Sequence, residues 1–154
     1  MMLKFKILFI LLSVFLIQHA FATHNRAGEI TYRHITGYTY EFTVTTYTKL
    51  SGESEGADRP RLQIVWGDGN ADSIDRVSRI PTQYADVFQN IYRMYHTYTG
   101  PGRYIVSMAD PNRIDNIINM TNSVNTVFYI EDTVIILNPN NVGYNSSPTL
   151  LISH

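Results

Sequence analysis

The stretch RLQIVWGDGN, at residues 61–70, decides the fold. Apolar residues recur at every second position of its first six, so Leu62, Ile64 and Trp66 share one face of an extended chain. The segment 67–70 then stops the strand, because Gly, Asp and Asn are the residues that tight turns favour. The stretch therefore predicts a β-strand with an inward-facing Trp66 and a turn at its end.

The same two-residue period recurs along the chain. The other predicted strands are 28–34, 38–44, 72–80, 90–98, 103–110, 127–130 and 133–137. Gly37 is predicted to turn the first two into a hairpin. A β-bulge is expected near Thr45-Thr46, since the next large apolar residue after Val44 is Tyr47. These features predict an all-β fold of about seven to nine strands, arranged as a β-sandwich with Greek-key connections.

The first 22 residues have the features of a secretory signal peptide. Two lysines precede an apolar run over 7–17, which is too short to span a bilayer comfortably. Small residues at the end of the segment predict cleavage after Ala22, and a single membrane anchor is the alternative. No later apolar stretch approaches 18 residues, so no membrane span is expected after leader cleavage. The domain plan is a signal peptide at 1–22, a folded domain at 23–137, and a linker or the truncated start of a following domain at 138–154.

Charge and cysteine content exclude several kinds of site. The chain has 12 Lys and Arg against 13 Asp and Glu, so no basic excess points to a nucleic-acid partner. It has no cysteine, which excludes a disulfide framework, a thiolate metal site and a cysteine nucleophile.

The turn after Trp66 carries the first candidate site. Asp68 is expected to accept hydrogen bonds from the backbone N–H groups that follow it and so to close the turn. The alternative is a calcium site, because Asp68, Asn70 and Asp72 place oxygen ligands at alternate positions. A standard EF-hand loop is rejected, since Ser73 and Arg79 stand where its glycine and its bidentate glutamate belong. No other cofactor is expected.

Trp66 and His96 are the other candidates. Trp66 is expected to pack in the core, and exposure beside tyrosines would instead make it a sugar-stacking platform. His96 is expected to be a packing or hydrogen-bonding neighbour, because no G-x-S-x-G or H-E-x-x-H motif occurs. A hydrolase would need a pocket that gathers Asp68, His96 and another polar group.

Two segments resemble polycystic-kidney-disease (PKD) domains, which are immunoglobulin-like sandwiches. The turn at 66–69 resembles their W-x-F-G-D-G motif, and 96–106 resembles their H-x-Y-x-x-P-G-x-Y-x-V segment. In this resemblance Tyr98 corresponds to a tyrosine corner, whose hydroxyl bonds nearby backbone. The residues that carry the resemblance are Trp66, Gly67, Asp68, Gly69, His96, Tyr98, Pro101, Gly102 and Tyr104.

A wider resemblance is to the N-terminal region of large secreted surface proteins of Bacteroidetes, which are gliding-motility-associated cargo of type IX secretion. It rests on the stretches 28–32, 90–92, 110–113, 122–125, 128–131 and 145–148. Such proteins continue into further repeats and a C-terminal sorting domain. The resemblance implies a secreted bacterial cell-surface location.

The leading functional hypothesis is a non-enzymatic structural or adhesive module of a bacterial cell-surface protein. Its partners would be neighbouring surface domains, proteins or glycans, with Phe128, Tyr129 and Ile130 in the core. The alternative is a carbohydrate-binding module accessory to a secreted hydrolase, which needs exposed coplanar aromatic side chains. A hydrolytic enzyme is the third hypothesis.

Overall fold

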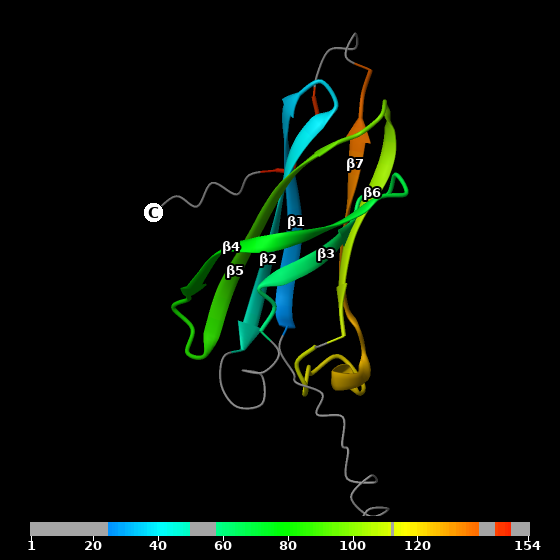
Figure 1. The fold of residues 1–154 in the computed structure, drawn as a ribbon. Helices are drawn as coiled ribbons and strands as arrows, with labels where there is room; N and C mark the ends of the chain where they lie inside the picture. The colour runs from blue at the N-terminus through cyan, green and yellow to red at the C-terminus, as the bar shows by residue number, and fades with distance from the viewer. Residues whose placement is uncertain (1–24, 50–57, 112, 139–143, 149–154) are drawn as a thin grey trace, which may run out of the picture.

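The computed structural model describes residues 25–49, 58–111, 113–138 and 144–148. The predicted leader at 1–22 lies outside the described residues. The all-β prediction is confirmed, because the described chain holds seven strands and a single turn of 3₁₀-helix, η2 (Ser123–Asn125). The strands are β1 (Asn25–Thr36), β2 (Thr39–Lys49), β3 (Arg61–Val65), β4 (Ala71–Pro81), β5 (Val87–Thr97), β6 (Gly102–Asp110) and β7 (Phe128–Ile136) (Figure 1).

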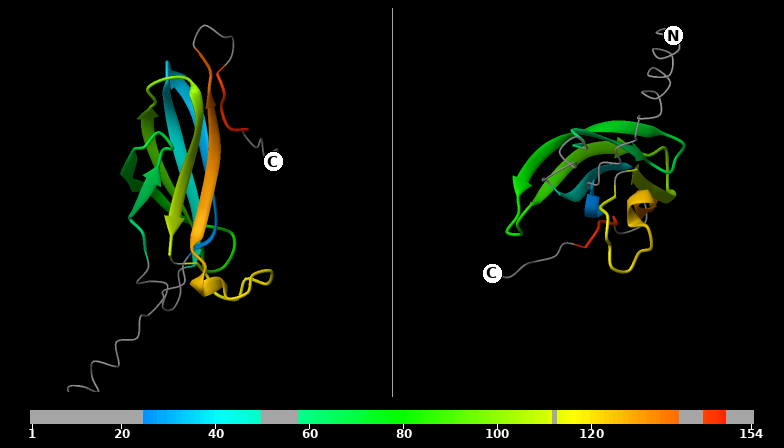
Figure 2. Two further views of the ribbon diagram at one scale, coloured as in Figure 1. Left: turned by 90° about the vertical axis from the view of Figure 1, so that its right-hand side faces the viewer. Right: turned by 90° about the horizontal axis from the view of Figure 1, so that it is seen from below.

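The strands form one strongly curved, nearly closed sheet in the order β1-β2-β5-β4-β3-β6-β7 (Figure 2). All six neighbouring pairs are antiparallel. β4 joins the two halves of the sheet, since its residues 71–75 pair with β3 and residues from Arg76 onward pair with β5. The register shifts between Arg76 and Ser78, and such an irregularity bends a strand and increases its twist. The two edge strands, β1 and β7, lie side by side across the opening.

The β-bulge predicted near Thr45-Thr46 is wrong. The register of β2 with β5 runs unbroken through both residues, so the bulge is absent from this pair. The alternation of buried side chains along β2 also continues, because Thr46 and Thr48 are buried in phase with Val44. These β-branched residues suit a strand. The Asn90 amide donates to Thr48 Oγ1 at 2.9 Å and to the backbone carbonyl of Thr46 at 3.5 Å.

The predicted strands 127–130 and 133–137 are one continuous strand, β7. Glu131 and Asp132 stay in register with Ser107 and Val106 of β6, so the two acids interrupt no pairing. The prediction that Tyr129 lies in the core is wrong. Successive side chains of a strand point to opposite faces, so Phe128 is buried while Tyr129 is 49% exposed on the other face of β7.

The core lies inside the curve of the sheet. Leu62, Ile64 and Trp66 are buried, as the alternation in 61–66 predicts. They pack with residues from all the other strands: Ile30, Tyr32, Tyr40, Phe42, Val44, Ile74, Tyr92, Val106, Met108, Phe128, Val134 and Ile136, together with Tyr98. This core holds the turn after β3 against the start of β6.

Gly67 is a point of close backbone approach. Its φ is +81°, and a Cβ atom there would lie 2.5 Å from the carbonyl oxygen of Ile105. Gly69 in the same turn has a φ of +92° with nothing within 4 Å of an added Cβ. A substitution at Gly69 therefore adds only backbone strain, whereas one at Gly67 adds a collision with β6.

We expect Gly67→Ala to lower the free energy of unfolding by about 3 kcal/mol or more, against about 1–2 kcal/mol for the matched control Gly69→Ala. Urea unfolding followed by Trp66 fluorescence measures both variants. Equal losses in the two variants would show that the approach of Gly67 to Ile105 carries no energetic weight.

Candidate functional site

Four of the predicted site residues lie together where the β3–β4 turn meets the end of β5, and we call them the corner: Trp66, Asp68, His96 and Tyr98. The backbone N–H of Trp66 donates to the carbonyl of Asn70 at 3.0 Å, which closes the turn. Inside it, Asn70 N–H donates to Asp68 Oδ1 at 3.0 Å. This is the backbone-capping role that the sequence predicts for Asp68, and it leaves the other carboxylate oxygen directed at β5.

Asp68 and His96 are brought together across 28 residues of sequence. His96 Nε2 lies 2.8 Å from Asp68 Oδ2. The imidazole also stacks on the Trp66 indole, with ring centroids 4.5 Å apart and planes 9° from parallel. The side chains of His96 and Asp68 are only 11% and 6% exposed. The pair therefore lies against the core rather than on the open surface.

The electrostatics of Asp68 follow from this position. Burial by itself raises the pKa of the carboxyl group, since it disfavours the charged form. The hydrogen bonds from the Asn70 backbone and from His96 outweigh that effect, so the pKa of Asp68 lies below its ordinary value of 3.8. The corner thus stabilises the ionised carboxylate.

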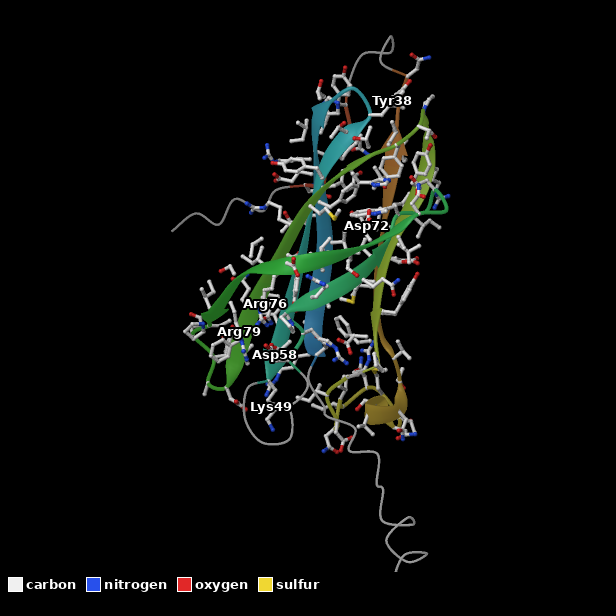
Figure 3. The ribbon with its side chains drawn as sticks, in the orientation of Figure 1. Tyr38, Lys49, Asp58, Asp72, Arg76 and Arg79 are labelled. Carbon is white, nitrogen blue, oxygen red and sulfur yellow. The ribbon has the colours of Figure 1, made fainter. Side chains whose placement is uncertain are left out.

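Asp72 holds Trp66 from the other side. Trp66 Nε1–H donates to Asp72 Oδ2 at 2.7 Å. A buried indole N–H without an acceptor costs free energy, so Asp72 supplies the one polar contact that this ring needs. Figure 3 shows Asp72 on β4, one residue after the start of the strand.

Two of the candidate calcium ligands, Asp68 and Asp72, already accept hydrogen bonds from side chains of the protein. One oxygen of Asp68 accepts from His96 and one of Asp72 accepts from Trp66. A cation at this turn would compete with those hydrogen bonds. In the part of the chain that the structure describes, no group of three His, Asp or Glu side chains is placed to hold a metal ion. A calcium site at this turn stays a prediction.

Tyr98 joins the corner to the sheet. Its hydroxyl donates to the carbonyl of Trp66 at 3.2 Å, and its N–H donates to the carbonyl of Tyr38 at 3.1 Å. The hydroxyl thus bonds backbone that is distant in sequence and near in space. Burial of the ring is the main cause that raises the pKa of Tyr98. Its hydroxyl therefore stays a donor at any physiological pH.

The remaining motif residues lie at the turn before β6. Tyr104 stacks on Tyr98 with ring centroids 4.1 Å apart, and its hydroxyl donates to the carbonyl of Gly100 at 3.0 Å. Gly102 begins β6, where a Cβ would lie 3.2 Å from the Tyr104 ring. Pro101 is exposed in the turn. The two motifs thus meet through the ring contact between Trp66 and His96 and the hydrogen bond from Tyr98.

The catalytic alternative meets only part of its requirement. Asp68 and His96 are within hydrogen-bond distance, so the separation that would exclude a hydrolase is not found. The third group that chemistry needs is a nucleophile or a positioned water next to the imidazole. The Tyr98 ring meets the His96 ring edge-on at 4.6 Å, while the Tyr98 hydroxyl is bonded to Trp66. The pair thus joins two segments of the chain, and the hydrolytic enzyme stays a hypothesis.

The sequence did not predict an ion network that lies at the other end of β4. Arg76 donates both Nη groups to the carboxylate of Asp58, at 2.5 and 2.8 Å, and also reaches Asn90 Oδ1 at 3.1 Å. Arg79 lies 3.5 Å from Asp58 (Figure 3). Ion pairs between distant segments leave no local pattern in the sequence. The one feature that could have indicated this network is Asn90, a polar residue at an inward-facing position of a tyrosine-rich strand.

A groove also lies outside the predicted residues. It has a volume of about 600 Å³ at the β4–β5 hairpin, next to the ends of β1 and β2. Tyr47, Tyr84 and Gln89 are among its lining residues, and Gln89 donates its amide to the Tyr47 hydroxyl at 3.3 Å. Tyr84 is 67% exposed. Aromatic and amide side chains thus share one open surface there.

Comparison of the chain with protein-family models, with curated proteins and with solved structures finds no match. The resemblance to PKD domains and to Bacteroidetes surface proteins therefore stays a prediction. Within the described ranges, no helix is long and apolar enough to cross a membrane.

The lowered pKa of Asp68 makes the corner sensitive to acid. A carboxyl group whose pKa is lower in the folded state contributes stability above its ordinary pKa, and that contribution is lost as the pH falls through the folded value. We expect the free energy of unfolding to drop below about pH 4, and Asp68→Asn to remove part of that drop. The slope for one group is at most about 1.4 kcal/mol per pH unit.

Asp75 is the matched control, because its pKa is also lowered, mainly by the exposed Arg61 beside it. Salt screens an exposed pair far more than a buried one. In 0.5 M NaCl, Asp75→Asn should therefore match the wild-type pH profile while Asp68→Asn still differs from it. Identical profiles for the wild type and Asp68→Asn at both salt concentrations would contradict the role given to the corner.

Proposed function

We propose that this protein is a secreted, non-enzymatic structural or adhesive module of a bacterial cell-surface protein, built as a PKD/immunoglobulin-like domain. Export would use the signal peptide at 1–22, cleaved after Ala22. The partners would be neighbouring surface domains, proteins or glycans, and the resemblance to gliding-associated proteins supports a place on the cell surface.

The observation that supports the proposal most is the use of the motif residues. Asp68, His96 and Tyr98 bond to the turn, to each other's segments and to the Trp66 carbonyl. Asp72, which lies beside the motif, accepts from the Trp66 ring. A set of polar groups that serves to hold β3, β5 and β6 in place favours mechanical rigidity over chemistry. A rigid β-domain is suited to display and to end-to-end contact with other domains.

The outer face of the sheet offers contact area. Tyr95 and Tyr129 are 57% and 49% exposed, on strands β5 and β7. Tyrosine gives a large contact area at low cost in side-chain entropy and so suits recognition surfaces. Contacts made by this face would leave the core unchanged.

Export and chemistry can be tested on the full chain. When the chain is expressed in a bacterium with general secretion, mass spectrometry of the exported protein should find Thr23 as its first residue, and Ala22→Tyr should leave the leader attached. Glycoside, ester and peptide substrates should show no turnover above that of His96→Gln. A cytoplasmic product with Met1 intact would contradict secretion, and turnover abolished by His96→Gln would establish a hydrolase.

A carbohydrate-binding module is the second candidate. Trp66 cannot be its stacking platform, because the ring is fully buried. The groove that Tyr47 and Tyr84 line is the observation that favours this candidate, since aromatic faces and amide groups are what sugar rings contact.

If the groove binds glycans, retention on polysaccharide affinity gels should fall at least threefold in Tyr84→Ala. Tyr95→Ala is the matched control, since Tyr95 is similarly exposed but is not among the residues that line this groove. Affinity electrophoresis with and without calcium measures both variants. Equal retention of the wild type and both variants would remove the carbohydrate-binding candidate.

A further inference from the structure

Residues 144–148 lie along the outer edge of β1. Ser147 N–H donates to the carbonyl of Tyr32 at 2.8 Å, while Tyr32 N–H donates to Ser147 Oγ at 2.9 Å. His34 N–H donates to Ser146 Oγ at 3.2 Å. The edge segment, Tyr144–Pro148, therefore runs antiparallel to β1 and supplies partners for its edge-facing backbone groups.

Side chains add specific contacts along the edge segment. The ring of Tyr144 stacks on His34, with centroids 3.5 Å apart and planes 8° from parallel. Asn145 donates its amide to the Tyr32 hydroxyl at 2.8 Å. These contacts distinguish Tyr-Asn-Ser-Ser-Pro from an arbitrary extended peptide.

The edge segment also contacts β7, the opposite edge of the sheet, because Ser147 Oγ donates to Asp132 Oδ2 at 3.4 Å. β1 contacts β7 directly as well, through the Tyr32 hydroxyl, which donates to the Thr133 carbonyl at 3.5 Å. Six successive antiparallel pairings make β1 and β7 run in the same direction. A chain that runs opposite to β1 therefore runs opposite to both strands, which is the direction that suits an additional strand at this opening.

The edge segment is attached at the surface. None of its five residues is buried, and Tyr144 is 53% exposed. Grooves of about 300 and 450 Å³ flank Ser147 and Pro148 on either side of β1. Hydrogen bonds and one ring stack, without a buried anchor, make an element that opens at low free-energy cost. The edge of β1 exposed by such opening is a template for strand addition.

We propose that the outer edge of β1 is a peptide-acceptor site, and that the edge segment of a second copy of this chain occupies it by exchange. Each copy carries both the acceptor and a ligand that already fits it, which is the condition under which exchange of an identical element links protomers at low cost. The inference concerns the association of copies and does not depend on where the protein is located.

Peptide binding to the full chain tests the acceptor site. The probe is a fluorescein-labelled peptide with the sequence of the edge segment, residues 144–148, and its binding is followed by fluorescence anisotropy. In the wild type the attached edge segment competes at a high effective concentration. The triple variant Tyr144→Ala/Asn145→Ala/Ser147→Ala should therefore bind the peptide at least tenfold more tightly than the wild type does. A peptide carrying the same three alanines should not bind.

Adding His34→Ala to the triple variant should reverse that gain, since the ring that Tyr144 stacks on is then missing. Thermal melts near the wild-type value confirm that the variants fold. Equal affinity of the triple variant for the two peptides would overturn the acceptor site.

Complementation tests the exchange between copies. The triple variant has an acceptor without a good ligand, whereas His34→Ala has a ligand without a good acceptor. In sedimentation velocity each variant alone should be mostly monomeric, and an equimolar mixture should form a dimer more readily than the wild type. A mixture that stays monomeric, or a triple variant that dimerises alone as well as the wild type, would overturn exchange. If the chain binds the peptide but never dimerises, the edge segment occupies only the acceptor of its own molecule, and the proposed exchange between copies is overturned.

Discussion

The structure depends on the stack of Trp66 on His96, with Asp68 bonded to the edge of the imidazole. This contact joins the turn after β3 to the end of β5, and Tyr98 adds a hydrogen bond from the next segment to the Trp66 carbonyl. It places polar groups beside the largest buried ring, and every one of those groups finds a partner within the protein. Buried polar groups that are fully bonded rigidify a core, so this corner sets the path of the strands that leave it.

The corner changes how its polar residues are interpreted. An aspartate and a histidine at 2.8 Å are also the first requirement of acid–base catalysis. Here the imidazole stacks on Trp66 and makes a T-shaped contact with Tyr98, so the same pair also joins the turn after β3 to the end of β5. The open surfaces lie elsewhere, at the hairpin that carries Tyr84 and along the edge of β1.

Strand-by-strand prediction succeeded where side chains alternate and failed where that pattern is ambiguous. Leu62, Ile64 and Trp66 face inward because each strand residue is turned opposite to its neighbours. The bulge predicted near Thr45-Thr46 is absent, because Thr46 and Thr48 are buried in phase with Val44 and contact Asn90 of another strand. Glu131 and Asp132 looked like a break, yet they continue β7 because β6 supplies the pairing. Both errors come from partners that are distant in sequence.

The sequence by itself determined the all-β class, the hairpin at Gly37 and the inward face of the strand that ends in Trp66, because period and turn chemistry are local properties. Only the tertiary structure decided that Asp68 meets His96, that Arg76 pairs with Asp58, and that Tyr144–Pro148 returns to β1. Each of these contacts joins segments far apart in the chain. A hydrogen bond or ion pair of that kind depends on the register of the whole sheet, which no single segment encodes.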